Sequence, residues 1–424
     1  MKRFIWFIAM AWAALCSSPA GAVTLQVQSL WLDAPRYSIG ANVTATVKVT
    51  SPSAVVVPQL VVMARDEAGN NYDFPLYNNV SVGTQTTTVT YSKVFTHPRR
   101  YLVQLAYRDE AGWHNVGPSI DFTVRPKSGV YPGWPASYDQ FDAFAAFRSR
   151  RVERPATYLD GKSWDIIGTP SYFTYNYGSA SSTGAKYGPD FLVSVPMLPF
   201  ISGVSIDAGA QGAYDTWWVK LATTLKNGGL GNVIIRPGWE ANSPGNYPWS
   251  AANGKEATYA AYFRHIVNAM RSVPGTSFKF DLCVTVAVDG ERGANLALMW
   301  PGDEYVDYLG LDLYDMYPGG YLDAASRWNW YLTAKSGLKD LAGFAAAHGK
   351  WMSFDEWALA SPSWNGGGDS SYFIYQMYYW MISHDVAFEV YNNTRYDQPP
   401  TDGRIDIGLY PQAAVAYKSL FGGY

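Results

Sequence analysis

Eight short apolar runs, separated by helical stretches, follow one another over residues 127–424. The runs read "GVYPGW", "PATYLD", "FLVSVPML", "NVIIRPGWE", "FKFDLCVTV", "YVDYLGLDLY", "KWMSFDEWAL" and "AFEVYNN". Regular alternation of strands and helices indicates β-α units around a parallel sheet. Eight such units in a segment of this length predict an α/β fold of the (β/α)8 TIM-barrel type, whose active sites lie at the C-terminal ends of the strands.

Residues 23–126 show a different pattern. In "VTATVKVT", Val43, Ala45, Val47 and Val49 alternate with polar residues, which is typical of a half-buried antiparallel strand. About a hundred residues of this kind predict a small all-β, immunoglobulin-like sandwich in front of the barrel. Such a domain either binds carbohydrate or serves as a spacer, and the sequence leaves both readings open.

The first 22 residues have the layout of a secretory signal peptide. Lys2 and Arg3 precede an apolar run, and Ala20-Gly21-Ala22 supplies small residues at a cleavage site. We therefore expect a mature chain that begins near Val23 in a secreted or periplasmic protein. No later segment has eighteen uninterrupted apolar residues, so no membrane span is expected.

Charge and motif content exclude several classes of function. The formal net charge of −3 falls to about −5 without the leader, and no basic run is present, so nucleic acid is not expected as a partner. Histidines occur only at 97, 114, 265, 348 and 384, without metal-binding spacing, and no Gly-x-Ser-x-Gly motif occurs. We expect no cofactor and no metal, and the oligomeric state stays open.

Two glutamates stand where predicted strands end. Strand alternation places Arg236 and Glu240 on one face of the fourth strand, and Glu356 on the inner face of the seventh with Asp355 turned outward. Two carboxyl groups at a barrel mouth can cleave a glycosidic bond with retention, one as acid/base and one as nucleophile. Arg236 could instead neutralise a structural carboxylate, and Asp355 is the alternative nucleophile.

Other polar and aromatic residues are expected around this pair. Alternation on the sixth strand brings Asp312 and Tyr314 to the mouth, although tyrosines also fill barrel layers. Aromatic rings pack against the apolar faces of sugars. The candidates for this role follow or flank strand ends: Trp249, Trp300, Tyr317 and Trp357.

The segments "RPGWEANSPGNYPWS", "WPGDEYVDYLGLDLY" and "KWMSFDEWA" resemble the fourth, sixth and seventh strand signatures of family 26 glycoside hydrolases, the β-mannanase group. The resemblance covers the barrel only. It implies a retaining endo-β-glycanase with Glu240 as acid/base, Glu356 as nucleophile and Arg236 supporting the carboxylates. Asn242 belongs to the same motif and is a candidate substrate-binding residue.

One position departs from this family. Its members usually carry histidine before the acid/base, where this chain has Trp239. We therefore expect Trp239 to bind substrate by stacking and plain mannan to be a weak substrate. The alternatives are a hydrolase that processes the exopolysaccharide of its own bacterium, and a non-catalytic barrel that only binds glycans.

Overall fold

The computed structural model describes residues 23–133, 138–245, 247–286, 293–316, 323–394 and 402–423, so the expected leader lies outside the described residues. The chain divides into two compact units. One holds the chain up to Pro35 with Ala41–Phe95 and Arg100–Phe122. The other holds Arg36–Gly40, Thr96–Arg99 and everything from Thr123 onward. Within the described ranges, no helix has the length and apolar character needed to cross a membrane.

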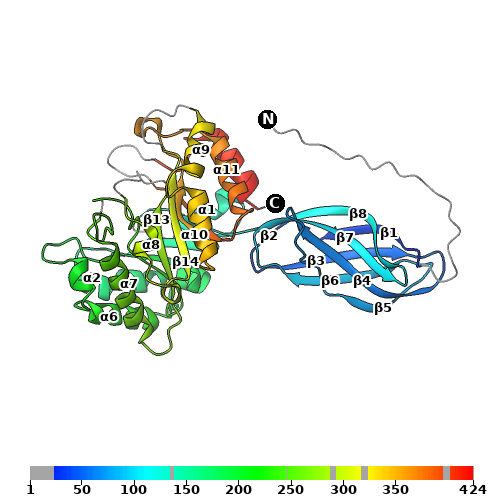
Figure 1. The fold of residues 1–424 in the computed structure, drawn as a ribbon, viewed down its shortest axis with the longest axis horizontal. Helices are drawn as coiled ribbons and strands as arrows, with labels where there is room; N and C mark the ends of the chain where they lie inside the picture. The colour runs from blue at the N-terminus through cyan, green and yellow to red at the C-terminus, as the bar shows by residue number, and fades with distance from the viewer. Residues whose placement is uncertain are drawn as a thin grey trace. The chain divides into compact units, whose positions relative to one another are not determined.

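The N-terminal strands form two sheets, as the sequence pattern predicts. One sheet has the order β1-β3-β6 and the other the order β2-β8-β7-β4-β5 (Figure 1). Val43, Ala45, Val47 and Val49 on β3 are fully buried while their neighbours reach solvent, because successive side chains point to opposite faces. The strands are β1 (Gln26–Leu32), β2 (Arg36–Ser38), β3 (Asn42–Thr50), β4 (Val55–Asp66), β5 (Tyr77–Val82), β6 (Thr87–Val94), β7 (Arg99–Asp109) and β8 (Gly112–Arg125).

The remaining eight strands close into a parallel barrel in which β9 pairs with both β10 and β16. Each of the eight apolar runs contains or overlaps one of these strands, which confirms the predicted barrel. The predicted domain boundary, between residues 126 and 127, falls between β8 and β9. As a limit between domains it stays a prediction. The strands are β9 (Lys127–Tyr131), β10 (Arg154–Tyr158), β11 (Leu192–Val195), β12 (Ile234–Pro237), β13 (Lys279–Thr285), β14 (Tyr308–Tyr314), β15 (Trp351–Ala358) and β16 (Val386–Asn392).

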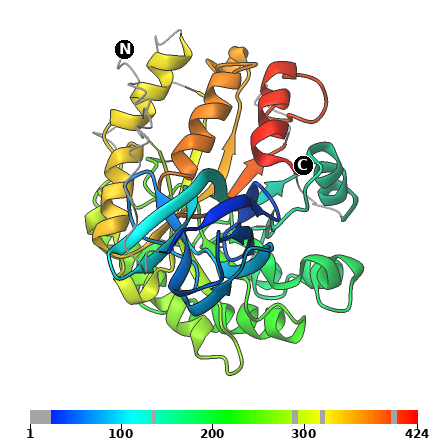
Figure 2. The same ribbon diagram turned by 90° about the vertical axis from the view of Figure 1, so that its right-hand side faces the viewer.

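Helices cover the outside of the barrel, coloured from green to red in Figure 2. Leu309, Leu311 and Leu313 on β14 belong to the large apolar cluster shared by strands and helices, as alternation predicts. The helices are α1 (Tyr138–Arg148), α2 (Trp164–Gly168), α3 (Ser171–Tyr177), α4 (Ser182–Tyr187), α5 (Ile206–Gly209), α6 (Asp215–Asn227), α7 (Glu256–Arg271), α8 (Leu296–Met299), α9 (Ala324–Thr333), α10 (Leu338–Ala347), α11 (Ser371–Met381) and α12 (Pro411–Phe421), with 3₁₀ turns η1 (Gly188–Asp190), η2 (Asp303–Tyr305) and η3 (Pro362–Trp364).

The barrel interior is apolar at one level and charged at the next. Ala156, Leu192, Ile234 and Val390 belong to a small inner apolar cluster. Two residues further along β12, Arg236 occupies the interior with its side chain fully buried. The charged layer therefore lies toward the C-terminal ends of the strands, the end at which barrel enzymes carry their active sites.

Gly310 on β14 leaves the space that two carboxyl groups of this layer need. A Cβ at this position would lie 2.1 Å from Asp281 Oδ1 and 2.1 Å from Asp355 Oδ2. We expect Gly310→Ala to lower the free energy of unfolding by about 1–3 kcal/mol, because overpacked interiors must shift side chains or backbone. Denaturant unfolding followed by tryptophan fluorescence measures the change.

Gly343 in α10 supplies the matched control, because a Cβ at this position would have no other atom within 4 Å. Gly343→Ala should raise stability by about 0.5–1 kcal/mol through helix propensity alone. Equal effects of the two substitutions would show that the space beside Gly310 is not tightly filled.

Candidate active site

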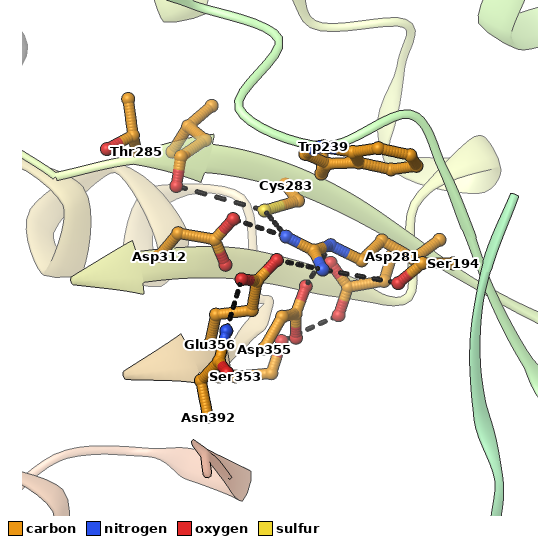
Figure 3. Close-up of polar contacts among 12 residues, drawn as sticks. Ser194, Trp239, Asp281, Cys283, Thr285, Asp312, Ser353, Asp355, Glu356 and Asn392 are labelled. Atoms are coloured by element: carbon orange, nitrogen blue, oxygen red, sulfur yellow. Dashed lines mark hydrogen bonds and ion pairs between the residues drawn. The ribbon is translucent and has the colours of Figure 1, made fainter. Parts of the chain in front are cut away.

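Arg236 lies at the centre of the charged layer. Its guanidinium pairs with Asp312 on β14, with Asp355 at 3.4 Å and with Glu356 Oε1 at 2.8 Å. It also donates to Ser194 Oγ at 3.2 Å, and all of these side chains are almost completely buried. Figure 3 shows the carboxyl groups of Asp312, Asp355 and Glu356 converging from neighbouring strands. One arginine thus serves three carboxylates.

Glu356 is held by hydrogen bonds on both carboxylate oxygens. Tyr158 Oη and Arg236 donate to Oε1, while Tyr314 Oη at 2.6 Å and Asn392 Nδ2 at 2.9 Å donate to Oε2. Burial alone would raise the pKa of Glu356, but Arg236 and the two tyrosines hold that pKa below its usual value. Glu356 is therefore an ionised, rigidly oriented carboxylate.

A bulge in β15 brings both neighbouring acids into the barrel. Leu311 pairs with Phe354, whereas the next residue, Asp312, pairs with Glu356, so Asp355 is the extra residue. A bulge of this kind interrupts the alternation of side chains. The prediction that Asp355 points outward is therefore wrong, because Asp355 and Glu356 both face Arg236, while Phe354 joins the outer core.

Glu240 reaches the mouth through a turn rather than along a strand. Strand β12 ends at Pro237, and Gly238 and Glu240 have positive φ angles of 69° and 48°. The strand alternation from which Glu240 is predicted to share a face with Arg236 does not extend to this residue, since left-handed backbone breaks the two-residue period, although Glu240 does lie at the mouth. A positive φ in glutamate is uncommon and is found mainly where the surrounding structure enforces it.

Glu240 nevertheless lies close enough to Glu356 for their charges to interact. Burial, followed by the negative charge of Glu356, raises the pKa of Glu240 to about 7, against the weaker opposing effect of Arg236. The two carboxyl groups are thus shifted in opposite directions. Near neutral pH, one holds a proton and the other does not, which is the division of roles that acid/base chemistry on a single bond requires.

Asn242 fixes the loop that carries Glu240. Its Oδ1 accepts from Thr285 N–H at 2.8 Å, and its Nδ2 donates to Thr285 C=O at 2.9 Å. Asn242 is also buried. The structure therefore gives it a positioning role at the end of β13, and the prediction that it binds substrate is not supported by its contacts.

Residues 218–359 match the family model described as glycosyl hydrolase family 26. This segment of the barrel, which holds all three strand-end motifs, is similar to that family. The resemblance read from the strand-end motifs is thereby confirmed.

Over 239 residues, the chain is 29% identical to endoglucanase H of Acetivibrio thermocellus. The aligned part makes up 50% of this chain and 22% of that relative, so the chain spans about a fifth of the relative's length. Among solved structures, GH26A from Muricauda sp. MAR_2010_75 has a TM-score of 0.38 and 14% identity, covering 63% of this chain and 84% of that one. A glycoside hydrolase family 5 enzyme from Prevotella bryantii B14 has a TM-score of 0.47 and 14% identity, covering 69% and 91%.

Three aromatic predictions are wrong. Trp249 is completely buried and supports Tyr247 and Trp239 from behind, with its ring parallel to that of Tyr247. Trp357 is also completely buried and packs outward, against Tyr417 and other rings of the helical layer. Neither ring can offer a face to a sugar.

Trp300, the third of these, lies at the other end of the barrel. Its Nε1 donates to Asp303 at 2.8 Å, and Asp303 also contacts His348 and Lys350, which directly precede β15. It therefore belongs to the N-terminal end of the strands, away from Glu356. Tyr317 lies outside the described residues.

Three neighbours of the carboxylates were not among the predicted residues: Tyr158, Tyr247 and Asn392. Tyr158 and Asn392 are the last residues of β10 and β16 and both bond Glu356. The strand-end argument applied to Glu356 would have found them. Tyr247 follows β12 in the loop after Glu240, and its ring lies 5.3 Å from that of Trp239.

Asp281 and Asp355 form a second carboxyl pair beneath the site. Among the described residues, Asp281 Oδ1 and both Asp355 oxygens are buried without a hydrogen-bond partner, although Asp355 lies 3.4 Å from Arg236. Ser353 Oγ donates to Asp281 Oδ2 at 2.6 Å. Burial, and for Asp281 the adjacent Asp355, raises the pKa of both groups. A proton on Asp281 supplies the missing hydrogen bond and leaves Asp355 ionised beside Arg236.

Replacement of Asp281 by asparagine should change how stability depends on pH. A folded-state pKa above the unfolded value means that the native protein loses stability as pH rises from about 4 toward the folded pKa, by up to ~1.4 kcal/mol per pH unit. Asp281→Asn cannot lose this proton, and its amide can still donate to Asp355. Denaturant unfolding at pH 5 and pH 8 should therefore show a smaller loss of stability in the variant. A variant much less stable than the native protein at pH 8 would contradict a protonated Asp281.

The pH dependence of activity should follow Glu240 on the alkaline side. An acid must be protonated, so kcat/KM should fall as pH rises through about 7, whereas Glu356, with its lowered pKa, stays ionised into the acidic range. Initial rates over a pH series on any cleaved substrate measure both limbs. A rate that stays constant up to pH 9 would remove Glu240 from this role.

Proposed function

We propose that this protein is a retaining β-glycoside hydrolase that cleaves a β-linked polysaccharide by double displacement. The observation that carries the proposal is the pair of neighbouring carboxyl groups with opposite pKa shifts, Glu356 ionised and Glu240 protonated. Retaining glycosidases divide their chemistry between two such groups.

In the first step, a Glu356 carboxylate oxygen attacks the anomeric carbon while Glu240 gives its proton to the departing glycosidic oxygen. This forms a covalent glycosyl-enzyme and releases one part of the chain. In the second step, Glu240, now ionised, takes a proton from water as that water attacks the anomeric carbon, and Glu356 is released. Arg236, Tyr158, Tyr314 and Asn392 orient the nucleophile through the contacts described above.

The proposed substrate contains β-linked glucose rather than mannose alone. Trp239 offers one indole N–H and a wide apolar face where the family usually has an imidazole, so it favours stacking over a directed bond to one hydroxyl. The name of the relative, endoglucanase H, agrees with a glucan substrate. The signal-like leader supports action outside the cytoplasm, as a secreted or periplasmic enzyme.

A hydrolysis panel tests the substrate. Purified protein is given β-mannan, cellulose, mixed-linkage β-glucan, xylan and bacterial exopolysaccharides, and the release of reducing ends is measured. We expect a glucose-containing β-glucan to be cleaved about tenfold or more faster than plain mannan, because Trp239 stands where the family usually has the histidine that helps to recognise the sugar beside the cleaved bond. Strong activity confined to β-mannan would contradict this substrate assignment.

Glu356→Ala serves as the control for the mechanism within the same panel. It should lower kcat by a factor on the order of 10⁴ in a protein that still folds, since it removes the nucleophile while Asp312 and Asp355 remain as partners of Arg236. Azide should restore turnover of an aryl β-glycoside in this variant and give an α-glycosyl azide. Full activity in Glu356→Ala, with loss of activity in Asp355→Ala, would move the nucleophile to Asp355.

A further inference from the structure

Phe200 is a large apolar side chain left open to solvent at the mouth of the barrel. It lies in the loop that follows β11, so it belongs to the C-terminal end of the strands, as Glu356 does. Its exposed fraction is 54%, and that of the next residue, Ile201, is 47%. Adjacent exposed apolar side chains beside a candidate active site indicate a surface that a ligand covers.

The ring of Phe200 is held in place from behind. Its backbone N–H donates to Gly161 C=O at 2.8 Å, and a Cβ on Gly161 would lie 2.6 Å from the Phe200 ring. Trp249, completely buried, lies 5.6 Å away between ring centroids. One side of the ring is thus fixed by protein while the other remains open, which creates a preformed platform.

A continuous series of ring contacts joins this platform to the catalytic carboxylates. Tyr158 bonds Glu356, and its ring lies 4.9 Å from Trp239; Trp239 lies 4.6 Å from Trp249, which contacts Phe200. Three successive ring contacts therefore link Phe200 to Tyr158, which donates a hydrogen bond to Glu356. In the closed barrel, β11, which precedes Phe200, lies four strands from β15, which carries Glu356, on the opposite side of the ring of strands. A sugar resting on Phe200 is therefore expected to be a different unit from the one whose anomeric carbon Glu356 attacks.

Polar groups flank the platform. Asp160 and Lys162 stand on either side of Gly161 and form an ion pair of 2.9 Å, with 74% of the Lys162 side chain exposed. Sugar sites combine an apolar surface with a few polar groups at its edge, because a pyranose ring has apolar C–H faces and hydroxyls around its rim. Phe200, Ile201 and this ion pair supply both parts.

We propose that Phe200 and Ile201 form a distal subsite that binds a sugar unit of the same β-linked polymer, remote from the bond that is cleaved. The proposal rests on the proposed glycosidase function and extends it: the protein gains affinity from a long chain and acts within polymers. The subsite contributes to polymer binding and takes no part in the chemical step.

Kinetics on a long and a short substrate test the subsite. The wild-type protein and Phe200→Ala are compared on mixed-linkage β-glucan and on 4-nitrophenyl β-cellobioside, or on β-mannan and an aryl β-mannobioside if the panel selects mannan. We expect KM for the polymer to rise about tenfold, the scale of one lost aromatic stacking contact, with kcat unchanged. Both constants for the short substrate should stay as in the wild type, because it does not reach Phe200.

Two further variants make the result specific. Gly161→Ala keeps the phenyl ring but displaces it, so it should reproduce the polymer defect. Tyr379→Ala removes an aromatic ring that is 56% exposed on α11 and should leave all constants unchanged. Equal losses on both substrates in Phe200→Ala, or no change on the polymer, would overturn the subsite.

Binding without turnover separates failure of the subsite from failure of the proposed function. The inactive Glu356→Ala protein, with and without Phe200→Ala, is run through native gels that contain the polymer. Stronger retardation with Phe200 present supports the subsite even if the catalytic assignment is wrong. Equal retardation overturns it even if hydrolysis is confirmed.

Discussion

The burial of Arg236 is the constraint on which the charged layer of the barrel depends. A guanidinium without exposed surface must have anionic partners, because an unpaired buried charge costs several kcal/mol. Asp312, Asp355 and Glu356 supply these partners from two neighbouring strands. The arginine in turn keeps Glu356 ionised at a depth where burial alone would protonate it. Without Arg236 the buried carboxylates would have no counter-charge, and without the carboxylates the buried guanidinium would have none.

This interior holds more carboxyl groups than one cation can balance. Burial and mutual repulsion raise the pKa of several of these groups, among them Glu240 near the surface and Asp281 and Asp312 in the layer below, which favours protonation there. A proton has different consequences at Glu240 and at Asp281. The proton on Glu240 lies at the mouth, where it can pass to a substrate, whereas the proton on Asp281 is enclosed beside Gly310 and satisfies Asp355. Repulsion among the buried carboxyl groups therefore favours both the proton that the proposed chemistry needs and the proton that lets Asp281 and Asp355 pack side by side.

The aromatic residues of the mouth are of two kinds, a buried ring that supports its neighbours and rings that are partly exposed to solvent. Trp249 is enclosed and fixes its neighbours, while Trp239, Tyr247 and Phe200 keep part of their surface open. The sequence shows an aromatic residue at each of these places, and only the fold decides which ring is covered. Trp249, one of the rings expected to bind sugar, is here a support, and the exposed phenylalanine comes from another loop.

Periodicity in the sequence determined the eight strands, the layer of helices and the strand ends at which the carboxylates stand, because burial of apolar residues imposes a fixed period on each element. The motifs at the strand ends also pointed to Arg236, Glu240 and Glu356. Tertiary structure alone decided the orientation of Asp355, the turn that carries Glu240 and the burial of Trp249 and Trp357. A bulge depends on the register of two strands that are far apart in the chain. A left-handed turn depends on the residues that surround it, and the exposure of a ring depends on what packs against it. None of these is a property of a local segment.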